Sequence, residues 1–147
     1  MKSFRFHLQK ILDLKEKEKE QAVWAYGQSV QRKNEEEGKL LALFERRDDM
    51  ARMLVKVQEQ PCQASQLIMI SHYRQAVEQS IRNQQRTVQG MEQEVERCQV
   101  RLRERMKESQ LWQRMRERSL SLFLEEQKAK EQKELDEIGT QLYLRRS

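Results

Sequence analysis

Proline and glycine are scarce in this 147-residue chain, which contains one proline and four scattered glycines. These residues end strands and build tight turns, so a sandwich or barrel needs them at short intervals. Aromatic residues make up 6% of the chain, hydrophobic residues 37% and charged residues 36%, which excludes a sizeable globular core. Because helix-forming residues carry the apolar side chains at steady spacing, we predict an all-α protein of long helices rather than a disordered chain.

Cysteine is limited to Cys62 and Cys98, and the opening residues lack the continuous apolar segment of a secretory signal. Both features favour a reducing cytosol over a disulfide framework. No stretch approaches the roughly 20 apolar residues that span a bilayer. We therefore predict a cytoplasmic protein that stays on the cytoplasmic side of the membrane and reaches it only through a partner.

The residues that enzymes and metal sites require are also missing. The two histidines, His7 and His72, are far apart, and no Cys and His pair has zinc-ligand spacing. No glycine lies near another, and no Gly-Lys-Ser/Thr phosphate loop is present. We predict a non-enzyme with no catalytic residue, no metal and no cofactor.

The one strong interruption is Pro61, which lacks a backbone donor and clashes with a preceding helical turn. We place a turn there, at about residues 60–65. The chain 1–147 is then a single antiparallel coiled-coil hairpin, with one helix at about 3–59 and a longer one at about 66–143.

The second helix carries the clearest pattern, because its apolar residues alternate in steps of four and three. This spacing averages 3.5 residues and keeps one stripe facing a partner helix in a left-handed coiled coil. Beyond residue 102 we expect the pattern to loosen through Met106, Ser109, Trp112 and Met115. We call the stripe before that point the seam; it consists of Val77, Ile81, Gln84, Val88, Met91, Val95, Cys98 and Leu102.

Folding the chain at Pro61 puts residue n near residue 122 minus n, since both helices rise about 1.5 Å per residue. Residues after about 120 then have no helix opposite them and form an overhang of about 25 residues, or about 40 Å. Because apolar side chains on the overhang would be exposed on a lone helix, we expect a partner protein to cover these side chains, with self-association as the alternative. They are Leu120, Leu122, Phe123, Leu124, Leu135, Ile138, Leu142 and Leu144.

Three further features of the sequence bear on packing and on possible partners. The segment Gln31–Lys39 lacks large apolar residues, which predicts a solvated, weak spot in the coil. Trp24 and Trp112 are interpreted mainly as packing residues, with partner anchors as the alternative. Between residues 97 and 118 basic residues exceed acidic ones by five, which suits a solvated face, an acidic protein partner or, least well, nucleic acid. We take Arg101, Arg105, Arg114 and Arg118 as this basic patch, and expect no nucleic-acid partner.

The opening segment resembles the flagellar type III export protein FliJ family, which has an aromatic, leucine and Lys-Glu-rich start. The segment that carries the likeness is Phe4-Arg5-Phe6-His7-Leu8-Gln9-Lys10-Ile11-Leu12-Asp13-Leu14-Lys15-Glu16-Lys17-Glu18. The resemblance implies a coiled-coil stalk that inserts in the hexameric export ATPase. It further implies contacts with the cytoplasmic domain of the membrane-embedded export gate and with export chaperones, and a need for the protein in flagellum assembly and motility. The alternative is a scaffolding coiled coil that self-associates without an ATPase partner.

The resemblance also implies two sets of contact residues. The ATPase-facing set is Phe4, Leu8, Ile11, Leu135, Ile138 and Leu142. The export-gate-facing set is Leu43, Met50, Tyr73, Val77, Ser80 and Gln84. Because Val77 and Gln84 also lie on the predicted seam, either they are buried or the seam is rotated at that point.

Overall fold

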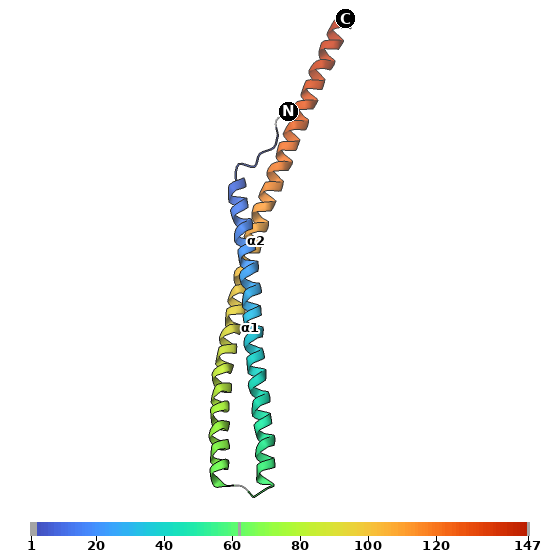
Figure 1. The fold of residues 1–147 in the computed structure, drawn as a ribbon. Helices are drawn as coiled ribbons and strands as arrows, with labels where there is room; N and C mark the ends of the chain where they lie inside the picture. Colours follow the sequence, from blue (N-terminus) through green and yellow to red (C-terminus); the bar gives the residue numbers. More distant parts are fainter. Residues whose placement is uncertain (1–2, 62, 147) are drawn as a thin grey trace. The chain divides into compact units, whose positions relative to one another are not determined.

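The computed structural model describes residues 3–61 and 63–146, so Cys62, which falls in the predicted turn and is expected to be exposed there, lies outside the described residues. These residues form two helices, α1 (Gln9–Gln58) and α2 (Ala64–Arg146), and no strand (Figure 1). The helices pack against each other in antiparallel fashion and the second is longer, which confirms the predicted fold class. The observed start of α1 is later than the expected residue 3, and α2 continues past the expected residue 143.

Local hydrogen bonds account for the helix ends. The backbone N–H of Gln9 donates to the carbonyl of Phe6 at 3.1 Å, which starts α1 after a non-helical segment. At the other end, the N–H of Gln60 donates to the carbonyl of Val57 at 3.4 Å, and Pro61, which has no N–H, follows. The predicted break at Pro61 therefore lies between the two helices.

The chain divides into two compact units, one formed by Met1–Gln21 with Arg103–Ser147 and the other by Ala22–Leu102. We call them the terminal unit and the hairpin unit. Each contains a piece of both helices, so each has its own interhelical packing.

In the hairpin unit the seam is confirmed, because all eight of its residues are buried or half-buried. Val77, Ile81 and Met50 form a buried cluster, and Phe44, which the pairing rule sets opposite residue 78, packs against it. Leu40, Leu43 and Ile70 complete this packing. Cys98 is a buried free thiol on the same face, which confirms its predicted place as a small seam residue.

The segment Gln31–Lys39 contributes a polar layer to the hairpin unit. The Gln84 amide donates to the Glu36 carbonyl at 3.0 Å and to the Glu36 carboxylate at 2.5 Å. Lys39 donates to the same carboxylate at 3.0 Å. Glu36 therefore lies within two residues of its predicted pairing, which would set it opposite residue 86. The side-chain hydrogen bonds occupy the place that apolar contacts fill elsewhere in the coil.

In the terminal unit, the packed residues of α2 are still spaced alternately by three and four, but many of them are polar. Arg105, Ser109, Trp112 and Arg116 are buried or half-buried at these steps. Met106 and Met115 are 43% and 39% exposed, so the apolar pattern loosens at these two residues as expected. A search for regularly spaced apolar residues does not detect packing positions that are occupied by arginine and serine.

Candidate binding surfaces

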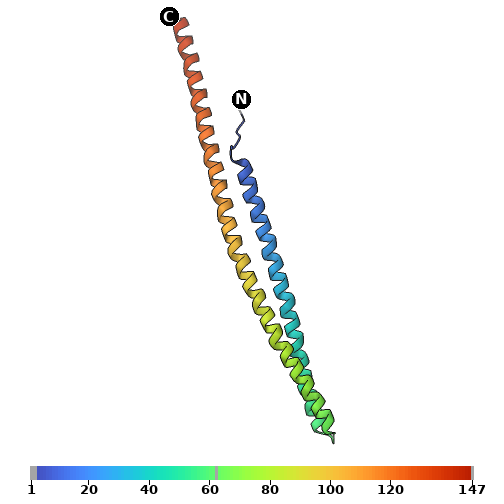
Figure 2. The same cartoon turned by 90° about the vertical axis from the view of Figure 1, so that its left-hand side faces the viewer.

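The N-terminal segment makes its last aromatic contact with α2 at Phe123. The rings of Phe4 and Phe123 are 5.6 Å apart and tilted by 50°, and the guanidinium of Arg116 lies 5.6 Å from the Phe4 ring centre. Beyond Phe123, α2 continues to Arg146, or about 35 Å of helix. We call residues 124–146 the overhang. Figures 1 and 2 both show it running past the N-terminal segment, and every residue in 128–146 is exposed.

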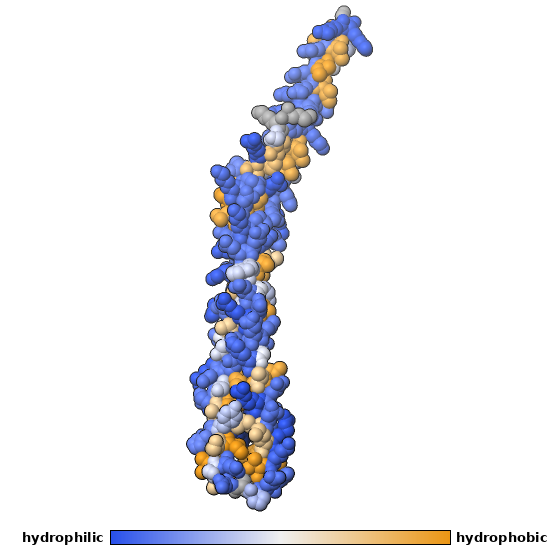
Figure 3. All heavy atoms as spheres, viewed as in Figure 1, coloured by the Kyte–Doolittle hydropathy of each residue, from blue (hydrophilic) through white to orange (hydrophobic). Residues whose placement is uncertain are grey.

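Three apolar side chains of the overhang share one face. Leu135, Ile138 and Leu142 are spaced by three and four residues and are 62%, 54% and 55% exposed. Continuing the packing steps of the terminal unit beyond Phe123 leads to Gln127, Lys130, Glu134, Glu137 and Gln141, which are polar. The apolar face therefore lies about 100° around the helix from the packing stripe. Figure 3 shows apolar surface along this C-terminal part of α2.

The other three predicted ATPase-facing residues lie elsewhere in the terminal unit. Phe4 and Leu8 are half-buried, and Ile11 is 37% exposed. Phe4 is engaged with Phe123 and Arg116, as described above. The six residues thus divide into an open face on the overhang and a partly covered N-terminal group.

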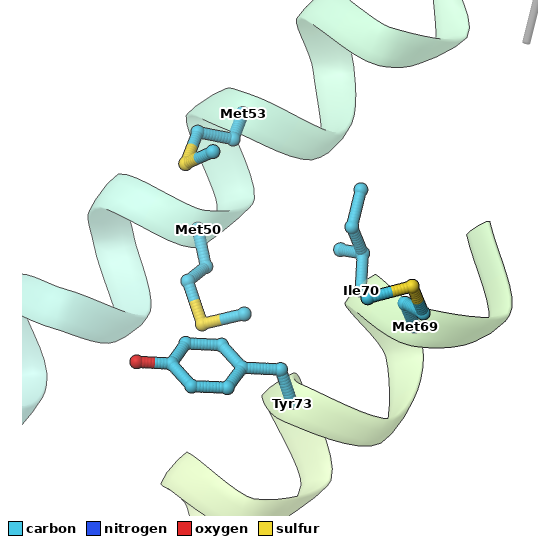
Figure 4. A pocket seen from close by; sticks show the side chains of 5 residues that line it. All are labelled: Met50, Met53, Met69, Ile70 and Tyr73. Carbon is cyan, nitrogen blue, oxygen red and sulfur yellow. The ribbon is translucent and has the colours of Figure 1, made fainter. Parts of the chain in front are cut away.

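A second apolar surface lies near the turn between the helices. Met50 and Met53 of α1 and Met69, Ile70 and Tyr73 of α2 line a pocket of about 250 Å³. Figure 4 shows the Met50 side chain directed toward the ring of Tyr73. Flexible thioethers beside an aromatic ring suit adaptable apolar contacts. We call this the methionine pocket.

Of the predicted gate-facing residues, only Met50 and Tyr73 line this pocket, and the six differ in how deeply they are buried. Val77 is 5% exposed and Met50 8% exposed, Leu43 packs on their cluster, and Gln84 is engaged with Glu36. Tyr73, at 50%, and Ser80 are partly or largely open to solvent. The seam is therefore not rotated near Val77. The pairing rule, which puts residue 53 opposite residue 69, could have pointed to the two outer methionines of the pocket.

The predicted basic patch also separates into two groups. Arg101, Arg114 and Arg118 are exposed, whereas Arg105 is half-buried. The Arg105 guanidinium lies 3.1 Å from the Glu18 carboxylate and 3.4 Å from that of Glu108. Arg105 thus belongs to the interhelical network of the terminal unit rather than to an open cationic face.

That network continues through Lys15 and Glu108, whose charged groups lie 3.1 Å apart. Their hydrogen bond raises the pKa of Lys15 and lowers the pKa of Glu108. At the next residue of each helix, buried Ser109 donates to the carboxylate of Glu16, and Gln113 donates to the same carboxylate at 2.6 Å. The bond from Ser109 is the main cause that holds the pKa of Glu16 below its usual range.

Residues 3–61 and 63–146 contain no group of three or more His, Cys, Asp or Glu residues that could hold a metal ion. Neither described helix has an apolar stretch long enough to cross a bilayer. Among the described residues, the candidate binding surfaces are the overhang, the methionine pocket and the charged positions along α2.

Comparison with known proteins places this hairpin in a family. The family model described as Flagellar FliJ protein matches residues 4–147. The chain belongs to the flagellar FliJ family. This FliJ-family chain is 28% identical over 146 residues to the Flagellar FliJ protein of Bacillus subtilis, and the match covers 97% of both chains.

A solved structure has the same fold. It is that of a candidate YscO homologue from Chlamydia trachomatis, with a TM-score of 0.69, 22% identity and 96% of each chain covered. The FliJ family is a non-enzymatic component of flagellar type III export, and membership implies partners in the export apparatus.

Proposed function

We propose that this FliJ-family chain is a stalk whose overhang inserts in the hexameric flagellar export ATPase. The observation that carries the proposal is the exposed apolar face formed by Leu135, Ile138 and Leu142. A lone helix in water is marginal, and apolar groups gain about 25 cal/mol for each Å² removed from water. Because the face is rotated away from the packing stripe, a separate protein covers it better than an extension of α1 would.

The stalk acts on the ATPase without performing chemistry. One asymmetric helix inside a ring of identical subunits contacts those subunits unequally. If it binds one nucleotide state of a subunit better than another, it shifts the population toward that state by its difference in affinity. By linkage, nucleotide binding then changes the affinity of the ring for the stalk.

The hairpin unit links the ATPase to the cytoplasmic domain of the export gate and to export chaperones. Tyr73 and Ser80 serve as direct contacts near the methionine pocket, while Met50 and Val77 hold the pocket in shape from beneath. Arg114 and Arg118 offer exposed positive charge to acidic export partners. The protein works in the cytoplasm, is held at the membrane through the gate, and serves flagellum assembly and hence motility.

The ATPase contact is tested by replacing the apolar face. Leu135→Ser/Ile138→Ser/Leu142→Ser should abolish co-purification with the ATPase hexamer, because all three side chains are exposed and their loss leaves the hairpin packing intact. Leu41→Ser is the control, since Leu41 is 60% exposed in the hairpin unit. Unchanged binding by the triple variant contradicts the proposal. Analytical ultracentrifugation of the chain alone tests the alternative, in which the same face forms a homodimer.

The gate contact is tested at two exposed tyrosines. Tyr73→Ala should weaken binding to the cytoplasmic gate domain, whereas Tyr143→Ala, at a 74% exposed overhang residue, should leave it unchanged. Far-UV circular dichroism should give the same helicity for both variants. Equal gate binding by the two variants would remove the methionine pocket from the proposed contact.

A further inference from the structure

The hairpin unit holds a second groove, between Trp24 and Arg32 of α1 and Gly90, Glu94, Arg97 and Arg101 of α2. Its volume is about 390 Å³. It is separate in sequence and in lining residues from the methionine pocket, and none of the contacts proposed above uses it. We call it the tryptophan groove.

Small residues at the interface create this groove. Ser29 and Cys98 are buried at its floor. Gly90 adds no side chain, and a Cβ placed on it would meet no atom within 4 Å. Trp24 stands at the edge with 65% of its surface exposed, so the prediction that it packs in the coil was wrong. A large exposed ring beside an open floor is the arrangement in which tryptophan anchors a partner.

The charges around the groove are predominantly positive and partly uncompensated. Arg97 is paired with Glu94 at 2.7 Å, and this hydrogen bond holds the pKa of Glu94 below its usual range. Arg101 is exposed and interacts with Glu94 only through longer-range attraction. Arg32 is exposed and makes no hydrogen bond or ion pair with any described residue. The groove thus presents two guanidinium groups that can bind carboxylates.

We propose that the tryptophan groove binds an acidic segment of another protein. An apolar side chain of that segment packs on Trp24 above Gly90, and its carboxylates pair with Arg32 and Arg101. Single-stranded nucleic acid fits less well, because one ring offers no run of stacking positions. The inference does not depend on the stalk function.

The test uses the full chain and three labelled probes, followed by fluorescence anisotropy. The first is a 16-residue helical peptide with leucine along one face and glutamate elsewhere. The second carries glutamine in place of glutamate, and the third is an oligouridine. The glutamate peptide should bind at least tenfold more tightly than the glutamine peptide, and its binding should weaken with added salt. No binding of the glutamate peptide, or tighter binding of oligouridine, would overturn the proposal.

Substitutions then locate the binding. Trp24→Ala and Arg101→Glu should each weaken binding of the glutamate peptide at least tenfold. Arg86→Glu, at an exposed α2 residue outside the groove, should change it less than twofold. If Arg86→Glu weakens binding as much as Arg101→Glu does, the attraction is general charge and the groove is not the site.

A filling variant separates the groove from its surroundings. Gly90→Leu should occupy the floor and weaken binding at least fivefold. Gly27→Leu is the matched control, because a Cβ at Gly27 would likewise meet no atom within 4 Å and Gly27 does not line the groove. Both variants should keep wild-type helicity by circular dichroism. Equal binding by the two leucine variants contradicts the proposal.

Discussion

The matched pair Val77→Ala and Val100→Ala separates packing from helix propensity. Both valines belong to α2 and to the hairpin unit, but Val77 is 5% exposed in the cluster with Met50 and Ile81 while Val100 is 47% exposed. Removing two buried carbon groups costs about 1.6 kcal/mol, and incomplete collapse of the cluster adds to that cost. Because alanine is the better helix former, the substitution also stabilises the helix by up to about 0.7 kcal/mol. Val77→Ala should therefore lose about 1–2 kcal/mol, and Val100→Ala should lose nothing or gain slightly.

Urea unfolding followed by far-UV circular dichroism measures this difference. With a slope of about 1–3 kcal/mol per molar urea, the Val77→Ala midpoint should fall by about 0.3–2 M while the Val100→Ala midpoint stays or rises. Equal midpoints for the two variants would refute the burial of Val77 and the seam with it. If Val77→Ala keeps its stability but loses gate binding, Val77 contacts the gate directly and does not act by supporting the methionine pocket.

Three other changes test the polar layers and the helix interior. Acidification should lower the thermal midpoint, because Glu16, Glu36 and Glu108 have lower pKa values in the folded chain than in the unfolded chain and therefore stabilise the fold above about pH 4.3. This stabilisation is lost as the pH falls through the lowered pKa values. Equal thermal midpoints at pH 6 and pH 3 would contradict this expectation. Ser109→Ala should cost about 1 kcal/mol in urea unfolding and raise the pKa of Glu16, measured by NMR titration. Gly38→Ala should add about 0.5–1 kcal/mol, since a Cβ there meets nothing, and a lower thermal midpoint would contradict this.

In the hairpin unit, the apolar spacing predicted the packed face of α2 residue by residue. Alternating steps of four and three identify one face of a helix wherever apolar side chains fill it, and all eight seam residues lie on the packed face. The position of Pro61 was sufficient to place the break between the helices, and the pairing rule set Glu36 within two residues of its observed partner.

The remaining positions could not be predicted, because hydrophobicity does not identify a polar residue that packs. Arg105 and Ser109 take packing positions through bonds to Glu18 and Glu16, which the spacing of apolar residues does not encode. Trp24 was expected to pack as a large apolar residue. Its exposure follows from its place one residue outside the packed positions, beside half-buried Ala25, and the sequence pattern of α1 is too uneven to fix that rotation.

The central claim is that the overhang, and not the paired part of the coil, binds the export ATPase. Every residue in 128–146 is exposed, so a chain that ends at Gln127 keeps all the interhelical contacts described above. The most direct measurement is co-purification of the hexameric ATPase with the full chain and with this shortened chain at equal concentrations. We expect the ATPase to retain the full chain and to lose the shortened chain, whose helicity per residue stays unchanged. Equal retention of both chains would show that the overhang is not the ATPase contact.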